Sequence, residues 1–162
     1  MNLAGKTIVI TGVSSGIGSD TAKLLRLQGA RVIGVDRNDP MLTLDGFVKA
    51  DLSTPEAIDA AVAQLPARID ALCNVAGVLG PGTLAEVTEA QFDHVMHVNC
   101  LAQLLSIRAF AARLRESAGA IVNVASVGAQ VGLPLMSVYC ASKAAVVAGQ
   151  IDATFGGSDL FL

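Results

Sequence analysis

The chain has 162 residues, of which 52% are hydrophobic and only 4% aromatic, so we expect one domain with a core of Val, Ala, Leu and Ile. Its 11 basic and 14 acidic residues give a net charge of -3 without a basic stripe, which argues against a nucleic-acid partner. Cys73, Cys100 and Cys140 are far apart and lack the C-x-x-C spacing of a metal or redox site, so we expect buried thiols in a reducing cytoplasm.

Short apolar runs alternate with helical patterns along the chain. The predicted strands cover, in chain order, residues 6–11, 30–35, 46–51, 69–75 and 120–125. The predicted helices cover residues 16–28, 54–65 and 89–116, the last as one or two helices. Thr54 is expected to cap the second of these, with Pro55 at its first position. This alternation predicts an α/β fold with a doubly wound parallel sheet and right-handed crossovers.

Residues 1–162 are expected to form a single domain, because no repeat, charge run or low-complexity linker divides them. Only residues 36–45, which include Pro40, separate the second and third strands, so the crossover helix there must be short or missing.

We expect neither secretion nor a membrane span. The start of the chain lacks the basic-then-apolar order of a signal peptide. The uncharged stretch 117–142 is long enough to cross a bilayer, but Asn123, Gln130 and Pro134 interrupt it, which favours a buried strand followed by a loop.

A glycine-rich turn joins the first strand to the first helix. In the sequence Thr-Gly-Val-Ser-Ser-Gly-Ile-Gly from Thr11, we expect Gly12 to permit the tight turn and Gly16 to let the backbone approach a pyrophosphate. Gly18 would let the helix pack on the sheet, and the helix N-terminus would face the diphosphate. A structural turn is the alternative, because such a loop is weak support by itself.

Asp36 ends the second strand about 20 residues beyond this loop, where a carboxylate can bind both ribose hydroxyls of an adenosine and repel a 2′-phosphate. Arg37 can neutralise part of that repulsion, but Ser14 and Ser15 offer no cation to a phosphate. The pattern therefore favours NAD over NADP.

Tyr139 and Lys143 are four residues apart in a segment with helical character, so their side chains share one face. A lysine ammonium near the phenol stabilises the phenolate and makes the tyrosine a workable proton donor and acceptor. A structural role for the only tyrosine of the chain is the alternative. Ser126 is expected to end the fifth strand at the carboxyl edge of the sheet, where its hydroxyl can bond a substrate carbonyl.

His94 and His97 are three residues apart, but no third ligand follows at a compatible spacing, so no metal site is predicted. The stripe of Leu101, Leu104 and Leu105 is expected to belong to the core.

Taken together, these motifs resemble the short-chain dehydrogenases/reductases over residues 4–147. The similar features are the glycine loop, Asp36, Asp51-Leu52, the segment Asn74-Val75-Ala76-Gly77, Asn99, Ser126 and the Y-x-x-x-K motif from Tyr139 to Lys143. The resemblance implies a Rossmann-like fold and hydride transfer between NAD(H) and a small-molecule alcohol or carbonyl substrate. It also implies a homo-oligomer, a dimer or tetramer, because the helix with the leucine stripe commonly packs against a second subunit in this family.

The resemblance assigns roles to individual residues. Tyr139 would exchange the proton, Ser126 would orient the substrate oxygen, and Asn99 would hold a water that connects Lys143 to solvent. The implied cofactor-binding residues are Gly12, Ser14, Ser15, Gly16, Ile17, Gly18, Asp36, Asp51, Leu52, Asn74, Ala76, Gly77, Tyr139 and Lys143. Among these, Asp51 would bind the adenine amine and Lys143 the nicotinamide ribose.

The end of the sequence departs from the family pattern. The sixth strand and the substrate-covering loop are missing after the Y-x-x-x-K motif, while residues 149–157 look like the family's seventh strand. We therefore expect residues to be missing between about Val147 and Gly149, and a plain glycine-rich tail is the alternative. Two rival functions also remain, a dinucleotide-binding module without turnover and an oligomerising subunit.

Overall fold

The computed structural model describes residues 3–149. Five parallel strands form one sheet, with β1 at its centre and the order β3-β2-β1-β4-β5. The strands are β1 (Thr7–Thr11), β2 (Arg31–Asp36), β3 (Gly46–Lys49), β4 (Ala71–Asn74) and β5 (Ala120–Asn123). The order reverses between β1 and β4, which makes this edge the switch point where doubly wound folds bind ligands.

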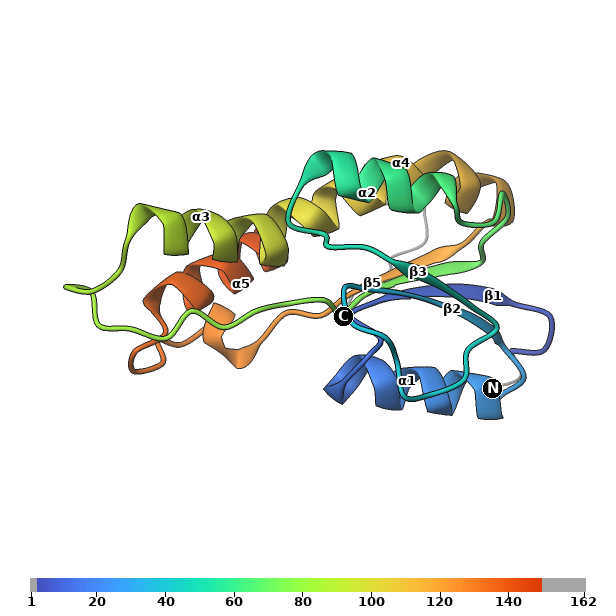
Figure 1. Ribbon diagram of the computed structural model, residues 1–162, viewed down its shortest axis with the longest axis horizontal. Helices are drawn as coiled ribbons and strands as arrows, with labels where there is room; N and C mark the ends of the chain where they lie inside the picture. Colours follow the sequence, from blue (N-terminus) through green and yellow to red (C-terminus); the bar gives the residue numbers. More distant parts are fainter. Residues whose placement is uncertain (1–2, 150–162) are drawn as a thin grey trace.

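Helices cover both faces of the sheet (Figure 1). Helix α1 (Gly16–Leu27) lies on one face, and α2 (Pro55–Ala63) and α4 (Ala102–Ser117) lie on the other. Helices α3 (Glu89–Met96) and α5 (Ser137–Gly149) project beyond the carboxyl ends of the strands. The doubly wound parallel sheet expected from the sequence is confirmed.

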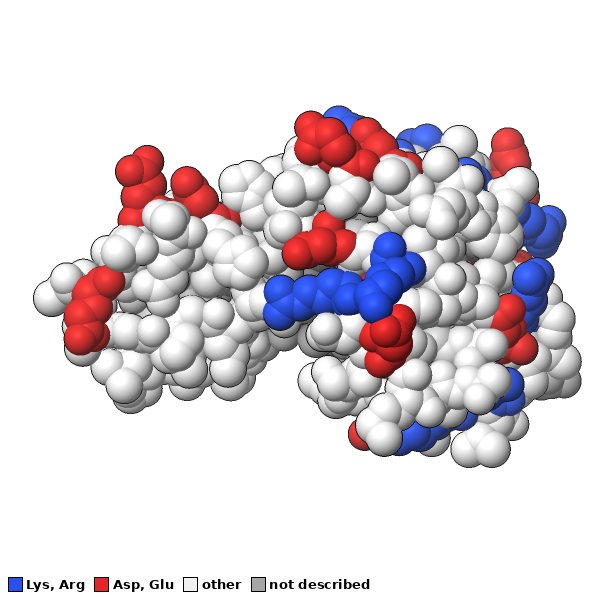
Figure 2. Space-filling view, in the orientation of Figure 1, with Lys and Arg blue, Asp and Glu red and all other residues white. Residues whose placement is uncertain are grey.

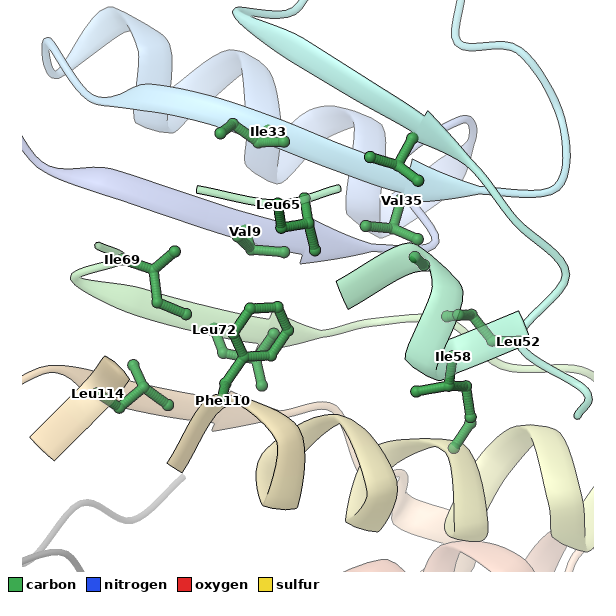
Figure 3. Close-up of a cluster of buried hydrophobic side chains, with 13 residues drawn as sticks. Val9, Ile33, Val35, Leu52, Ile58, Leu65, Ile69, Leu72, Phe110 and Leu114 are labelled. Atoms are coloured by element: carbon green, nitrogen blue, oxygen red, sulfur yellow. The ribbon is translucent and has the colours of Figure 1, made fainter. Parts of the chain in front are cut away.

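Alternation along β1 explains the two layers. Ile8 and Ile10 are buried on the α1 side, together with Val13 and Ala22, while Val9 is buried on the opposite side. Successive side chains of a strand point to opposite faces, so an uninterrupted apolar run fits a strand covered on both sides. Figure 3 shows the second cluster, in which Val9 and other strand residues face side chains of α2 and α4, including Phe110.

The predicted element boundaries hold to within a few residues, and the differences have local causes. Ala30 lies in the turn that follows α1 rather than in β2, and there its N–H donates to the Leu25 carbonyl. The third strand stops at Lys49, and the carboxylate of Asp51 accepts the N–H of Ser53 in a turn. Thr54 caps α2 as expected, with its hydroxyl accepting the N–H of Ala57 at 3.3 Å and with proline in the first turn. Among residues 3–149, no helix lies between β2 and β3, which agrees with the short connection.

The long helical segment 89–117 contains a π-helical turn, η1 (His97–Leu101), between α3 and α4. This segment is long and apolar enough to cross a membrane by length and composition, a property that core helices of soluble proteins share. Ala102, Phe110 and Leu114 of this segment are buried against the sheet and α2.

Two expectations about burial are wrong. Only Cys73 is buried, whereas Cys100 and Cys140 are half-buried, and all three are free thiols. Leu104 of the leucine stripe is 46% exposed, because it lies on the face of α4 that turns away from the sheet, while Leu105 packs against the core.

Helix α5 is continuous through Val147, Ala148 and Gly149. Gly149 therefore belongs to this helix rather than to a strand. The expectation that residues are missing between about Val147 and Gly149 stays a prediction. The rest of the seventh-strand-like tail, residues 150–157, lies outside the described residues.

Candidate active site

A cavity of about 210 Å³ opens at the carboxyl ends of the strands, at the switch point. Loops after four strands build it, because parallel strands bring their carboxyl ends to one edge. The cavity is lined by Gly12, Ser15, Val35, Asp36, Arg37, Asn38, Ala50, Asp51, Leu52, Val75, Ala76, Gly77, Val78 and Val98. Its volume is below the roughly 300–1,000 Å³ typical of small-molecule sites, so it would take only part of a dinucleotide.

The turn after β1 requires glycine at two positions. Gly12 has a φ of +72°, and a Cβ there would lie 2.7 Å from the backbone of Ala76. A Cβ on Gly18 would collide with the carbonyl oxygen of Gly12. The loop is therefore pressed between β4 and the start of α1, with no room for a side chain at either position.

The start of α1 suits an anion. Ser15 is its N-cap residue but makes no capping bond with its side chain, and no acidic residue lies in the first turn. The first N–H groups of the helix therefore remain open toward the loop, where a phosphate oxygen can accept them. Gly16, at the first position, would meet nothing within 4 Å if it carried a Cβ, so this side of the loop is open.

Asp36 lies at the end of β2 with its carboxylate held in place. One oxygen, Oδ2, accepts the N–H of Ser14 at 3.0 Å, and the other, Oδ1, accepts the N–H of Asn38 at 2.9 Å. Each carboxylate oxygen has a second lone-pair site, so both remain able to accept a ribose hydroxyl.

Seven of the residues assigned to the cofactor line the cavity, and seven do not. Those that line it are Gly12, Ser15, Asp36, Asp51, Leu52, Ala76 and Gly77. Those outside its lining are Ser14, Gly16, Ile17, Gly18, Asn74, Tyr139 and Lys143. Asn74 is only 1% exposed, and its Nδ2 donates to Asn123 Oδ1 at 2.8 Å, so it joins β4 to β5 within the sheet.

Tyr139 and Lys143 lie on the same side of α5, as their spacing predicts. Lys143 Nζ is 6.0 Å from the centre of the Tyr139 ring and donates to the Val124 carbonyl at 2.7 Å. Lys143 is only 3% exposed, and this burial lowers the pKa of its ammonium group. Holding the charged form there requires the carbonyl partner.

Asn99 lies in the π-helical turn and clamps the segment after β4. Its Oδ1 accepts the N–H of Val78 at 2.7 Å, and its Nδ2 donates to the Val78 carbonyl at 2.9 Å and to Ser142 Oγ at 3.0 Å. Ser142 in turn donates to the Tyr139 carbonyl at 2.7 Å. A π-turn shifts the register of a helix by one residue and often occurs at functional sites, and here it contains the buried Asn99.

Gly77 connects the cavity with this group. A Cβ on Gly77 would lie 3.3 Å from Asn99 Oδ1 and 3.5 Å from Lys143 Nζ, and Gly77 itself lines the cavity. The structure therefore brings together Gly77, Asn99 and Lys143 from three separate segments, next to the proposed cofactor cavity.

Ser126 is not at the end of β5, as the sequence suggested, but three residues beyond it. It caps the 3₁₀ turn η2 (Val127–Ala129), and its Oγ accepts the N–H of Gly128 at 3.1 Å. The strand ends at Asn123 and the chain turns there, so η2 packs against α5. Ser126 thus lies on a segment in contact with the helix that carries Tyr139.

Sequence reasoning missed Ser142 and Val78. Ser142 is fully buried and bridges Asn99 to α5, while Val78 supplies both backbone groups that Asn99 binds. The position of Ser142 directly before Lys143 was a weak signal, and a backbone partner such as Val78 leaves no signal in the side-chain pattern.

His94 lies in α3 and His97 in the π-helical turn η1. His97 Nδ1 lies 2.7 Å from the Asp93 carbonyl one turn earlier. No group of three His, Cys, Asp or Glu side chains within residues 3–149 is arranged to hold a metal ion.

This chain is similar to known proteins in both sequence and fold. Coniferyl-alcohol dehydrogenase of Pseudomonas sp. (strain HR199 / DSM 7063) is 55% identical over 127 residues, which are 78% of this chain and 46% of that protein. Dehydrogenase/reductase SDR family member 6 of Rattus norvegicus is 34% identical over 153 residues, 90% of this chain and 62% of that protein. The chain thus spans between about half and two thirds of the length of these curated relatives.

Solved structures are similar to this chain as well. An NADH-dependent reductase complexed with NAD is 30% identical and superposes with a TM-score of 0.85, over 93% of this chain and 72% of that one. Aldohexose dehydrogenase of Thermoplasma acidophilum superposes with a TM-score of 0.89 over 96% of this chain and 63% of that one, and at 24% identity it shows the fold alone. A family model described as short chain dehydrogenase matches residues 6–149. The chain belongs to the short chain dehydrogenase family.

Proposed function

We propose that this chain binds NAD(H) in the cavity at the switch point and interconverts an alcohol and a carbonyl compound, with Tyr139 as general acid and base. The observation that carries the proposal is the buried Lys143, held by the Val124 carbonyl beside the Tyr139 ring and within reach of Gly77 in the cavity wall. A buried ammonium beside a phenol is costly as a structural element alone and useful for proton transfer.

Asp36, the turn after β1 and the start of α1 would hold the adenosine and diphosphate. This fit rests on the close approach at Gly12, the open helix start and the two carboxylate oxygens fixed by Ser14 and Asn38. When bound there, the nicotinamide would supply the hydride acceptor and donor, so that an alcohol and NAD⁺ would be converted to a carbonyl compound, NADH and one proton.

The residues of the chain would handle that proton. Tyr139 would take it from the alcohol hydroxyl or return it to the carbonyl oxygen, and Lys143 would stabilise the phenolate. Ser126 would orient the substrate oxygen from η2. Asn99 would keep the segment at Gly77 in place through its bonds to Val78. As the resemblance to the family implies, Asn99 would also hold a water that connects Lys143 to solvent.

Oxidation of NADH with a panel of aldehydes and ketones tests the proposal. We expect turnover that falls at least a hundredfold in Tyr139→Phe, with NADH affinity unchanged. Turnover that survives this substitution would contradict the assignment of Tyr139. Binding of NADH without any turnover would instead favour the rival function of a dinucleotide-binding module. Absence of NADH binding would favour the other rival function, an oligomerising subunit.

The preference for NAD over NADP is a separate proposal, based on the fixed carboxylate of Asp36. Titration of both reduced coenzymes should show tighter binding of NADH than of NADPH. Asp36→Ala should reduce the difference between their binding free energies by roughly 1–3 kcal/mol. Tighter binding of NADPH by the unmodified protein would contradict it, and would direct attention to the exposed Arg37 beside the carboxylate.

We also propose a homo-oligomer in a reducing cytoplasm. Leu104 of α4 and Val147 of α5 are 46% and 45% exposed, and the free thiols fit a reducing environment. Light scattering at micromolar concentration would contradict the association if it showed a clean monomer.

A further inference from the structure

The part of the molecule that carries Tyr139 has a one-sided charge composition. We define the α3/α5 lobe as residues 77–101 and 124–149, in which α5 packs against α3, η1 and η2. Its acidic residues are Glu86, Glu89 and Asp93, and its single Lys or Arg is Lys143. Figure 2 shows the consequence, since the face of this lobe that it draws carries acidic but no basic side chains.

The side chain of Lys143, the single Lys or Arg of the lobe, is not accessible to a ligand at the surface. Lys143 is only 3% exposed, and its Nζ donates to the Val124 carbonyl at 2.7 Å. Burial disfavours its charged form, as the lowered pKa indicates. An anionic group of a ligand bound on this lobe would therefore find no free ammonium or guanidinium group among the described residues of the lobe.

Apolar side chains occupy the surface instead. More than half of each of the following is exposed: Leu79, Leu84, Val127, Val131 and Leu135. They belong to two segments, one between β4 and α3 and one between β5 and α5. The N–H of Gly82 donates to the Leu135 carbonyl at 2.9 Å, which ties the two segments together. Val127 directly follows Ser126, and Leu135 lies in the turn just before α5, the helix that carries Tyr139.

These observations decide between charged and uncharged ligands. A carboxylate or phosphate that leaves water requires a paired cation or several hydrogen-bond donors, and the three acidic residues of the lobe add only negative charge to it. An apolar ligand gains from covering exposed Leu and Val side chains and needs only a few polar partners at its reacting end.

We propose that the substrate is an uncharged, largely apolar alcohol or the corresponding aldehyde or ketone, whose apolar part lies on the α3/α5 lobe. By the same charge distribution, we expect hydroxy acids, sugar phosphates and thioesters of coenzyme A to be poorer substrates. This inference rests on the proposed function, because it places the reacting oxygen at Ser126 and Tyr139.

A matched pair of alcohols tests the inference. 4-Methylbenzyl alcohol and 4-(hydroxymethyl)benzoate differ mainly by the negative charge opposite the reacting carbon. With saturating NAD⁺ we expect kcat/KM to be at least tenfold higher for 4-methylbenzyl alcohol. A ratio near one, or one that favours the benzoate, would overturn the inference.

A charge placed on the lobe should change this ratio. Val131→Lys adds a cation at a side chain that is 53% exposed, and it should raise kcat/KM for the benzoate relative to the neutral alcohol at least threefold. The matched control is Leu27→Lys, at an 80% exposed side chain of α1 on the far side of the sheet, which should leave the ratio unchanged. An unchanged ratio in Val131→Lys, or an equal change in the control, would place the substrate elsewhere.

Failure of the proposed function has a different signature. If neither alcohol is oxidised although the carbonyl panel shows turnover, the inference is overturned. If the panel shows no turnover either, the proposed function fails, and saturation-transfer NMR of the two alcohols with NADH-saturated protein decides the substrate class. Stronger transfer to 4-methylbenzyl alcohol supports the inference. Equal or stronger transfer to the benzoate, or transfer to neither, overturns it.

Discussion

Replacing Asn99 with alanine tests the clamp between the segment after β4 and helix α5. The substitution removes three hydrogen bonds of a side chain that has no exposed surface, two with the backbone of Val78 and one with Ser142 Oγ. Each such bond contributes about 1 kcal/mol net, so we expect the free energy of unfolding to fall by about 3 kcal/mol. For a protein of this size that corresponds to a decrease in Tm of about 6–12 °C.

Urea unfolding followed by far-UV circular dichroism measures this loss. The matched control is Asn38→Ala, an exposed asparagine whose hydrogen bonds to Asp36 and Ser14 use only its backbone, and it should change stability by less than about 0.5 kcal/mol. A loss below about 1 kcal/mol in Asn99→Ala would refute the clamp. Tyr139→Phe should leave the unfolding midpoint unchanged, which separates the structural role of Asn99 from the proton transfer proposed for Tyr139.

Three further predictions concern stability and reactivity. The hydrogen bond from the Thr7 N–H and the Lys6 ammonium hold the pKa of Asp70 below its ordinary value of 3.8. The stabilisation is therefore present above that value and is lost as the pH falls through the lower folded pKa. Asp70→Asn should cost about 1–2 kcal/mol at pH 7, and its deficit in urea unfolding should shrink as the pH falls below 3.8; a deficit that stays constant with pH would contradict this. Burial raises the pKa of the Cys73 thiol to about 11, so iodoacetamide at pH 8 should modify Cys73 only after denaturation, as peptide mass spectrometry would show; early labelling would contradict the burial. Ala118 ends α4 with a φ of +49°, so Ala118→Gly should raise the free energy of unfolding by about 1 kcal/mol, and a lower urea midpoint would show that the strain is absent.

Local signals in the sequence were sufficient to predict the order of strands and helices and to select several candidate site residues. The apolar run of β1, the glycines of the turn and the Thr54-Pro55 helix start each act within a few residues, so their pattern is visible without tertiary structure. Likewise, the four-residue spacing of Tyr139 and Lys143 places them on one face of any helix.

Tertiary structure decided what these residues contact. Lys143 is bonded to a carbonyl after β5, Asn99 clamps the backbone of Val78, and Gly77 meets both, although these segments are far apart in the sequence. Ser126 lies beyond the end of β5, where the sequence pattern had placed it. Asn99 lies in a π-helical turn that the periodicity of the sequence did not predict. The physical reason is that side-chain periodicity tells which face of an element is apolar, whereas the partner of a buried polar group is a backbone group positioned by the packing of the whole sheet.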